Sequence, residues 1–571
     1  MKGHFIVCGM GHVGYRIVDL LGRLGETITV ITQSARAEWL HAAQARGVKV
    51  LIGDAQDERL LIDVGIHEAQ AVLAVTDRDL VNIEIALDAK RLHPDIPVVV
   101  RLFEQHLARQ LESAFDIRRA LAMSTLAAPV FAAAALGERI VSSFTLEGSW
   151  YVIGRLTLDP ASPLLNLSTR HISDQYRLAM LTHDHEGTGD VLLPPPDTTL
   201  HPGDRVILVG RKIEWDKFTG DATAPGPVPC TLRRSLAGIR QRVRLSSLNI
   251  VHHIWRNAPL SLRLIFMVLN VLIIFSVFVF HFAMNLTLMD ALYFIITTVT
   301  TVGYGDITPR DTRPWLKLYG CLVMILGSAT MTTLYSIITD FIITARFQQL
   351  LGGRSIPQAD HIVVVGLGGV GYRTVHELQR AGTRVVGIDL SPDSEFIEAI
   401  RTVAPVIIGD ARVPDILEKA GVPKAHAVVA TTGNDAVNLS IGLATRRLNP
   451  QGRTVVRLFD ADFARKVRSA LRIDVAMSAS LIAAPTFVAS SLYPDVEGAF
   501  VLDNRLFILL HRPVGVAWHG CTPSQLHAEQ AMYVLMRQSS AGQPYRPACD
   551  DTPLRRDENV LTVTWRQLSD G

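Results

Sequence analysis

A sequence repeat, interrupted by a long apolar region, constrains the fold of this chain most strongly. The segment HFIVCGMGHVGYR at His4–Arg16 returns as HIVVVGLGGVGYR at His361–Arg373. Further pairs follow in the same order: LIGDA at Leu51–Ala55 and IIGDA at Ile407–Ala411, VVRLF at Val99–Phe103 and Val455–Phe459, and AAP at Ala127–Pro129 and Ala483–Pro485. The chain therefore contains two copies of one domain, and its 571 residues leave room for further domains.

Short apolar runs alternate with helical stretches in both copies. In the second copy these runs are HIVVVG, RVVGID, PVIIGD, AVVATT and TVVRLF, which are rich in β-branched residues. A continuous run of this kind is typical of a strand buried on both faces, as in a parallel sheet covered by helices. The pattern predicts two Rossmann-like, doubly wound α/β domains.

A strongly apolar region lies between the copies and accounts for a hydrophobic content of 48%. Leu262–Phe282, about 21 residues long, suffices for a helix that crosses a hydrocarbon core of about 30 Å. Trp315–Ile343 is a second and longer run, whose end should protrude from the core. Leu288–Val299 is too short to span and fits a re-entrant helix. The region therefore predicts a helical membrane hairpin.

Charge predicts the orientation of this hairpin. No acidic residue occurs between Asp221 and Asp290, and arginines gather before the first span. These arginines are Arg233, Arg234, Arg240, Arg242, Arg244, Arg256 and Arg263. Such a cluster marks the cytosolic side, so both repeat copies and both termini are expected to be cytoplasmic. The alternative is nucleic-acid contact, which a membrane span beside the cluster and a net charge of only +2 disfavour.

The short helix ends in the string TTVTTVGYGD, Thr297–Asp306. A permeating K⁺ must exchange its hydration water for oxygen ligands at little net cost, and rings of backbone carbonyls from four chains can supply them. Gly303 and Gly305 tolerate positive φ, so successive carbonyls can face one axis. The negative end of the short helix would favour a cation there.

The other residues of this string complete the predicted filter. Thr301 can add its hydroxyl as the innermost ligand, whereas Val302 and Tyr304 are expected to point away and pack against the supporting helix. The filter is thus expected at Thr301, Val302, Gly303, Tyr304, Gly305 and Asp306, with K⁺ held at the first four of these residues. A tight glycine-rich loop in a membrane hairpin is the alternative.

Thr297–Asp306 resembles the signature filter of potassium channels, and Leu262–Ala345 resembles the two-span pore of the prokaryotic type. The two repeats resemble RCK domains, regulators of potassium conductance that are also called TrkA or KTN domains. The resemblance implies a homotetramer in the lipid bilayer of the cell (inner) membrane, which conducts K⁺ passively and is gated by a small cytosolic ligand. This chain departs from the usual two-span arrangement, because one RCK copy precedes its pore.

The resemblance also implies the domain bounds. We expect an N-lobe at 1–140, a C-lobe at 141–217, a basic linker at 218–261, the pore at 262–345, a gating linker at 346–360, a second N-lobe at 361–495 and a second, degraded C-lobe at 496–571. The C-terminal copy is the expected actuator of the gate, since the gating linker joins it to the second span.

Two residues of the second span are candidates for control of the pore. By the resemblance, Gly327 stands where a gating hinge is expected, and close helix packing is the competing reason for a glycine. Asp340 lies near the cytosolic end, where four copies would form a ring of negative charge at the inner mouth. A solvated carboxylate at a helix end is the alternative.

Both copies carry a G-x-G-x-x-G motif between a strand and a helix, formed by Gly9, Gly11, Gly14, Gly366, Gly368 and Gly371. The helix N-terminus then offers N–H groups to a phosphate. Asp389 follows the second strand of the C-terminal copy and suits a ribose, which predicts NAD(H), ADP or ATP in that copy. The N-terminal copy has Thr32 instead, with Arg36 nearby either to meet an extra phosphate or as a plain surface residue.

The third and fourth strands end in further candidates. By the resemblance, Asp54 and Asp410 lie near an adenine, although either carboxylate is equally suited to cap the following helix. Asn82 and Asn438 have the same two interpretations. In the first C-lobe Gly203–Asp204 marks a turn. The C-lobes are open to three roles, which are ion binding, ligand binding and subunit pairing, and Ca²⁺ sensitivity is open with them.

The glycine motif and the repeated domain are also compatible with two other function classes. A Rossmann motif by itself would suggest an NAD-dependent oxidoreductase, yet no recurring His, Tyr or Lys constellation beside the glycine loops argues for hydride transfer, so we do not expect an enzyme. A regulatory subunit of a potassium transport system would carry the RCK fold without a filter. The string TVGYGD favours a channel that supplies its own pore.

Overall fold

A computed structural model describes residues 3–103, 105–137, 140–160, 162, 164–185, 189, 191–219, 260–310, 312–350, 355–459, 461–540 and 542–569. The chain divides into two compact units, residues 1–228 with 354–571, and residues 229–353. The arginines from Arg233 to Arg256 lie outside the described residues, as does the side chain of Arg263. The orientation that they predict therefore stays a prediction.

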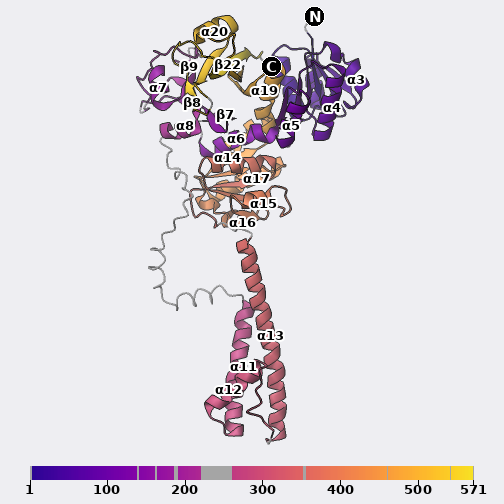
Figure 1. The fold of residues 1–571 in the computed structure, drawn as a ribbon, viewed down its shortest axis with the longest axis vertical. Helices are drawn as coiled ribbons and strands as arrows, with labels where there is room; N and C mark the ends of the chain where they lie inside the picture. Colours follow the sequence, from indigo (N-terminus) through magenta and orange to yellow (C-terminus); the bar gives the residue numbers. More distant parts are fainter. Residues whose placement is uncertain are drawn as a thin grey trace. The chain divides into compact units, whose positions relative to one another are not determined.

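The first repeat copy is a parallel sheet with the strand order β3-β2-β1-β4-β5-β6 (Figure 1). Its strands are β1 Phe5–Cys8, β2 Ile28–Thr32, β3 Lys49–Ile52, β4 Ala71–Ala74, β5 Val98–Leu102 and β6 Arg119–Ala122. Its helices are α1 His12–Arg23, α2 Ala37–Ala45, α3 Glu58–Asp63, η1 Ile66–Glu68, α4 Asp79–Leu92, α5 Gln105–Ala114 and α6 Met123–Leu136. The central strands β1 and β4 are buried at every residue, as their apolar runs require.

The second copy repeats this order as β14-β13-β12-β15-β16-β17. Its strands are β12 Ile362–Val365, β13 Val385–Asp389, β14 Val406–Ile408, β15 Ala427–Ala430, β16 Arg453–Arg457 and β17 Val475–Met477. Its helices are α14 Gly369–Arg380, α15 Ile397–Arg401, α16 Pro414–Lys419, η2 Val422–Lys424, α17 Asp435–Leu448, α18 Ala461–Leu471 and α19 Ala479–Leu492. Two doubly wound α/β domains are thereby confirmed.

The last helix of each copy packs on the other copy. Phe131 of α6 is fully buried in a cluster with Ile362 and Val364 of β12. In return, Phe487 of α19 is fully buried in a cluster with Val7 of β1. Both helices are apolar on nearly every side, so each needs a second surface to cover it. Through this exchange each copy receives part of its hydrophobic core from the other.

Each copy continues into a five-stranded antiparallel sheet. The first has β7 Ile140–Leu146, β8 Ser149–Thr157, α7 Thr169–Tyr176, β9 Ala179–Asp184, β10 Val191–Leu192, β11 Arg205–Arg211 and α8 Lys212–Thr219. The second has β18 Val496–Leu502, β19 Arg505–Pro513, α20 Pro523–Gln530, β20 Tyr533–Gln538, β21 Arg546–Pro547 and β22 Asn559–Gln567. The orders β10-β9-β11-β8-β7 and β21-β20-β22-β19-β18 are equivalent, so the second lobe keeps the topology although its turn at 557–559 differs.

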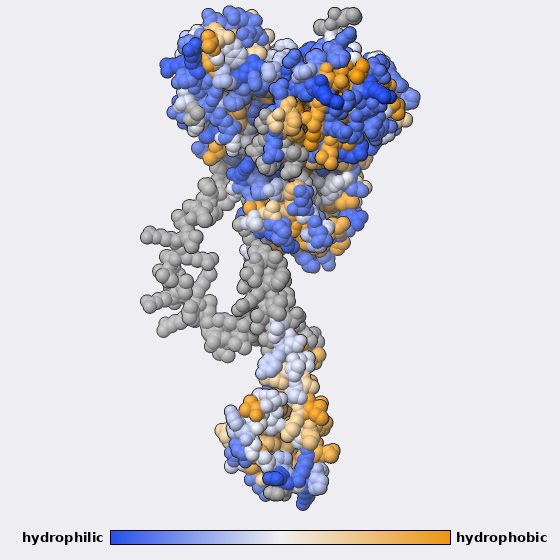
Figure 2. Space-filling view, turned by 45° about the vertical axis from the view of Figure 1, so that its right-hand side comes forward, coloured by the Kyte–Doolittle hydropathy of each residue, from blue (hydrophilic) through white to orange (hydrophobic). Residues whose placement is uncertain are grey.

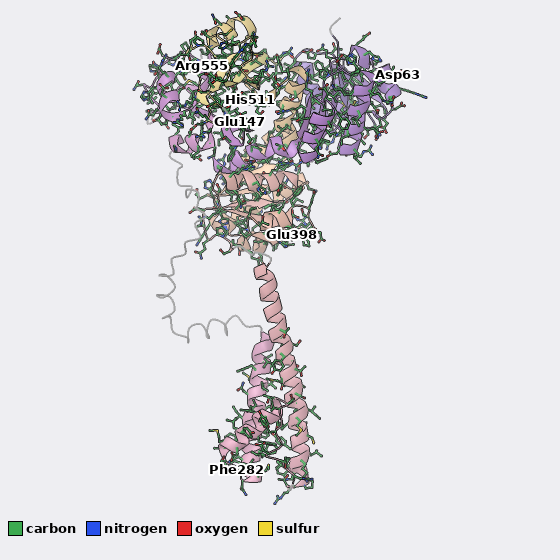
Figure 3. The ribbon with its side chains drawn as sticks, viewed as in Figure 1. Asp63, Glu147, Phe282, Glu398, His511 and Arg555 are labelled. Carbon is green, nitrogen blue, oxygen red and sulfur yellow. The ribbon has the colours of Figure 1, made fainter. Side chains whose placement is uncertain are left out.

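The two lobes pack against each other within the chain. Tyr151 and Ile153 of β8 share a buried cluster with Phe507 of β19. At the edge of this contact Glu147 approaches His511, with 3.9 Å between Oε1 and Nε2 (Figure 3). The lobes therefore pair the two copies of one chain, and pairing between subunits stays a prediction.

The second unit is a helical hairpin with α11 Leu260–Met284, α12 Leu288–Val299 and α13 Pro314–Leu350. Leu264–Met284 and Pro314–Ile337 are long and apolar enough to cross a membrane. Only 22% of each apolar window is buried, and hydrophobic side chains cover much of the hairpin surface (Figure 2). A soluble protein would bury such helices, so these surfaces suit lipid or another subunit. The helix α13 is longer than the predicted run Trp315–Ile343.

The helix exchange predicts a stability effect across the copies. Replacing Phe487 by Ala empties a buried site in the core of the N-terminal copy, which should cost about 3–5 kcal/mol and lower the thermal unfolding midpoint of the full chain in detergent. Leu481→Ala is the matched control, because Leu481 lies on the same helix and is 45% exposed. Its cost should be about 1 kcal/mol or less. An equal loss for both variants would contradict the exchange.

Candidate functional site

The predicted filter follows a short helix whose two ends are both defined. Thr287 caps the N-terminus of α12, where its hydroxyl accepts a hydrogen bond from the Asp290 amide at 3.1 Å. The helix ends at Val299, two residues before Thr301, the first residue of the predicted filter. The partial negative charge of its C-terminal carbonyls is therefore placed where a cation would pass.

The filter backbone has positive φ at alternate residues. The values are +60° at Thr301, +51° at Gly303 and +78° at Gly305. Glycine adopts this region freely, but at Thr301 it costs about 1–3 kcal/mol. Backbone strain of this size persists only where the surrounding structure holds the residue, and it is typical of functional sites. The sequence indicated the two glycines and gave no sign of the strain at Thr301.

Contacts to α12 hold the filter strand in place. The amides of Val302 and Gly303 both donate to the carbonyl of Thr297, at 2.9 and 3.1 Å. The ring of Tyr304 stacks on that of Tyr293 from α12, with 6.4 Å between centroids and 1° between planes. The expected packing of Tyr304 against the supporting helix is thus present. Its side chain is nevertheless 71% exposed in the single chain, so most of its surface has no partner within this subunit.

Gly327 and Asp340 both lie on the continuous helix α13. A β-carbon at Gly327 would lie 3.0 Å from Cγ2 and 3.2 Å from Cα of Val299. Close packing between α13 and the end of α12 therefore accounts for this glycine, and its role as a hinge stays a prediction. The side chain of Asp340 lies outside the described residues, so the ring of charge stays a prediction as well.

The glycine loops of the two copies have the same geometry. Gly9 and Gly366 begin the turns with φ of +103° and +84°. A β-carbon at Gly371 would lie 1.9 Å from the carbonyl oxygen of Gly366, and Gly14 is crowded in the same way by Gly9. At the middle glycine of each copy, Gly11 and Gly368, a β-carbon would meet nothing within 4 Å. The outer glycines are therefore required by the fold, and the middle ones leave room for a ligand.

These middle glycines also begin helices. Gly11 precedes α1 and Gly368 precedes α14, and no side chain caps either helix. Their N-terminal amides are therefore available to an anion.

The carboxylates of the C-terminal copy differ in their surroundings. Asp389 accepts hydrogen bonds from the amides of Leu367 and Ser391, at 2.6 and 3.1 Å, which fix it beside the glycine loop. Asp410 accepts from the amide of Arg412 at 2.9 Å and pairs with its guanidinium, which lowers the pKa of Asp410. Asp410 thus stabilises a turn, and α16 begins later, after Val413.

The N-terminal copy shows the same distinction. Asp54 accepts from the Gln56 amide at 3.1 Å, whereas the cap of α3 is Asp57. Capping of the following helix, one expectation for Asp54 and Asp410, is therefore wrong, because both carboxylates close a turn before it. Arg36 lies over the Trp39 ring, 4.7 Å from its centroid.

A cavity of about 890 Å³ opens at the glycine loop of the N-terminal copy, and its walls come from both copies. Gly9, Gly11 and Asp54 line it together with Phe396 and Phe459 of the C-terminal copy. Arg36 is absent from the lining.

Two guanidiniums that the sequence did not single out, Arg101 and Arg457, also line this cavity. Burial lowers the pKa of both, against the opposing charges of Asp77 and Asp79 on Arg101 and of Asp435 on Arg457. Arg101 further lowers the pKa of Arg457, so two partly buried cations lie near each other here. The Nε atom of each has no hydrogen-bond partner among the described residues. Their only sequence signal is the repeated VVRLF string, and the arrangement favours an anionic ligand.

Asn82 and Asn438 are fully buried and serve the scaffold. The Asn82 amide group accepts from the Thr76 amide at 2.8 Å and donates to the Arg101 carbonyl at 3.0 Å. Asn438 makes the same two bonds in the C-terminal copy. Through these bonds each asparagine connects the loop after the fourth strand to the fifth strand and holds that loop in position.

Family models match three segments of the chain. The TrkA-N domain matches residues 5–119 and 362–479, and the ion channel domain matches residues 267–344. "Probable potassium channel protein 2" of Methanocaldococcus jannaschii is 29% identical over 32% of this chain and 54% of its own length. "Voltage-gated potassium channel Kch" of Escherichia coli is 29% identical over 39% of this chain and 52% of its own length. The chain thus spans about half the length of these curated relatives.

Among solved structures, the "GsuK Channel" matches with a TM-score of 0.51 over 99% of this chain and 77% of that one, at 14% identity. A likeness at this level of identity concerns the fold alone.

The glycine geometry predicts opposite outcomes for two neighbouring substitutions. Gly371→Ala drives a methyl group into the backbone of Gly366, which should cost at least about 1–3 kcal/mol and lower the thermal unfolding midpoint. Gly368→Ala points its methyl group into open space and should change stability by about 0.5 kcal/mol or less. The measurement is thermal unfolding of the full chain by intrinsic fluorescence. A larger loss for Gly368→Ala would mean that the loop geometry is different.

Proposed function

We propose that this chain, which carries two TrkA-N domains and an ion channel domain and is homologous to prokaryotic potassium channels, is one subunit of a potassium-selective channel gated by ligands of its TrkA-N domains. The observation that carries the proposal is the TVGYGD string, set between two candidate membrane spans behind a short helix. Alternate positive φ values and the strained Thr301 support its role as a filter of carbonyl ligands.

The proposed assembly is a homotetramer with both termini in the cytoplasm. One chain supplies only a quarter of each carbonyl ring, so four chains are needed to surround an ion. Val302 and Tyr304 are 54% and 71% exposed in the single chain, and neighbouring subunits would cover them. The apolar faces of α11 and α13 would meet lipid.

Gating would follow from nucleotide binding. Asp389 is held beside the C-terminal glycine loop by two backbone amides and keeps free lone pairs for ribose hydroxyls, which supports NAD(H), ADP or ATP in that copy. At the N-terminal glycine loop, Arg101 and, from the C-terminal copy, Arg457 are the cations that would face a ligand in the cavity. The guanidinium of Arg36 lies over the Trp39 ring instead. A ligand shifts the gate only if its affinity differs between the two states of the channel.

Selectivity is the direct test of the pore. In planar bilayers under bi-ionic conditions, K⁺ should permeate at least about ten times better than Na⁺, a reversal-potential shift of about 59 mV or more. Gly303→Ala should abolish this selective current, since position 303 needs positive φ. Gly320→Ala is the control, because its methyl group would meet only Phe280 at 3.9 Å. Equal permeability of the two ions in the unmodified channel would refute the proposal.

The ribose position is tested by two substitutions at equivalent strand ends. Asp389→Asn keeps an oxygen for the Leu367 amide but removes the charge, and should weaken ADP or NAD(H) binding about tenfold or more. Thr32→Ser at the end of β2 is the matched control and should leave the affinity unchanged. Calorimetric titration of the full chain in detergent measures both. Unchanged affinity in Asp389→Asn would remove the basis for a nucleotide in this copy.

A further inference from the structure

Three ligand-type side chains meet at one end of the first C-lobe. His183 Nε2 lies 2.8 Å from Asp204 Oδ2, and His185 Nδ1 lies 2.7 Å from Asp204 Oδ1. All three ligand atoms lie within 4.8 Å of one another. The Asp204 side chain is fully buried, whereas that of His185 is 49% exposed and gives access from solvent.

The backbone fixes these positions before any ion binds. His183 pairs with Val206 in the register of β9 and β11, which places the end of β9 beside the turn that carries Asp204. That turn is held by the His201 amide, which donates to Asp204 Oδ2 at 2.8 Å, and by the Gly203 amide, which donates to the Leu158 carbonyl at 2.8 Å. The donors therefore lie in, or directly beside, the ends of two paired strands, which position them.

The second lobe offers an internal comparison at the same place in the fold. Arg537 pairs with Val560 in the register of β20 and β22, as His183 pairs with Val206. Glu558 therefore stands where Asp204 stands, and it binds Arg537 with 2.8 Å between Nη2 and Oε2. The second lobe thus places a permanent cation beside its buried carboxylate, and a guanidinium cannot ligate a metal.

The first lobe places two imidazoles at that position, and an imidazole nitrogen, unlike a guanidinium, can ligate a metal ion. We propose that His183, His185 and Asp204 bind a divalent transition-metal ion of the zinc class, which supplies the positive charge that Arg537 supplies in the second lobe. Two nitrogens and one carboxylate oxygen suit Zn²⁺, whereas Ca²⁺ and Mg²⁺ require mostly oxygen ligands. Water would complete the coordination of such an ion. The His201 ring also lies nearby, with 5.7 Å between its centroid and that of His185.

Metal binding requires a rearrangement of the cluster. The two nitrogens now lie 2.7 and 2.8 Å from different oxygens of Asp204, and the three ligand atoms lie within 4.8 Å of one another. Metal–ligand bonds of about 2.0–2.2 Å in a tetrahedron would place these atoms about 3.4 Å apart. As the ion enters, each imidazole that directs its N–H at Asp204 exchanges that proton through solvent to its other ring nitrogen, so that the nitrogen facing Asp204 gains the lone pair that binds the metal. The bound ion would pin the end of β9 to the turn before β11.

The test is calorimetric titration of ZnCl₂ into the full chain in detergent, purified without a histidine tag and stripped with EDTA. We expect one saturable site per chain and a higher thermal unfolding midpoint with Zn²⁺. His183→Arg, which recreates the ion pair of the second lobe and so preserves the fold, should weaken binding at least about tenfold, and so should His185→Asn at its half-exposed position. His171→Asn, an exposed histidine on α7, is the matched control and should bind normally.

Three outcomes would overturn the proposal. They are the absence of saturable Zn²⁺ binding in the unmodified chain, an equal loss of binding in His171→Asn, and binding of CaCl₂ as tight as that of ZnCl₂. Each distinguishes a metal site from a pair of structural hydrogen bonds to Asp204. Because the readout is binding and unfolding, the result is independent of whether the chain conducts K⁺.

Discussion

The reciprocal burial of α6 and α19 is the constraint on which the unit of residues 1–228 and 354–571 depends. Each helix is apolar around its circumference, so its own sheet cannot cover all of its apolar surface. The other copy covers the remainder. The two repeats therefore cannot act as independent domains. The cavity at the N-terminal glycine loop shows the consequence, since Phe396, Arg457 and Phe459 of the second copy form part of its wall. A ligand bound there touches both copies and acts directly on the contact between them.

The hairpin follows a different principle, in which packing supports a strained backbone. Gly327 lets α13 approach Val299 closely, and Val299 ends the helix that carries the filter. Tyr304 stacks on Tyr293, and two amides converge on the Thr297 carbonyl, so the positive φ of Thr301 is held from several sides. A substitution on α13 can thus disturb the predicted filter residues through α12. The exposed apolar faces of the same helices need a partner that the single chain does not provide.

The two copies differ mainly at positions that the fold itself does not constrain. Both copies keep the crowded outer glycines and the buried asparagine, because the turn and the fifth strand depend on them. They differ at Thr32 and Asp389, which end the equivalent strands β2 and β13. They also differ at the buried carboxylates Asp204 and Glu558, whose partners are imidazoles in one lobe and a guanidinium in the other. One scaffold therefore carries two sets of chemistry.

The sequence by itself determined the features that depend on local pattern. The repeat specified two domains, β-branched runs specified parallel strands, and the bounds of α12 agree with Leu288–Val299 because a short apolar run has few alternatives. The glycine motif likewise indicated both loops. The end of α13 was harder to predict, because the helix continues through the polar residues that follow its apolar run.

Only the tertiary structure decided which surfaces and side chains meet. The apolar sequence of α6 indicates that this helix is buried, but it does not indicate which sheet covers it. For Arg36 the sequence left two interpretations, a phosphate contact and a plain surface residue, and in the structure its guanidinium lies over the Trp39 ring. Arg101 and Arg457 reach the cavity from strands of different copies. His183 and Asp204 lie about 20 residues apart, and the antiparallel register of β9 and β11 brings them together. Periodicity reports the neighbours of a residue along the chain, whereas pairing across strands depends on register and packing, which no short segment encodes.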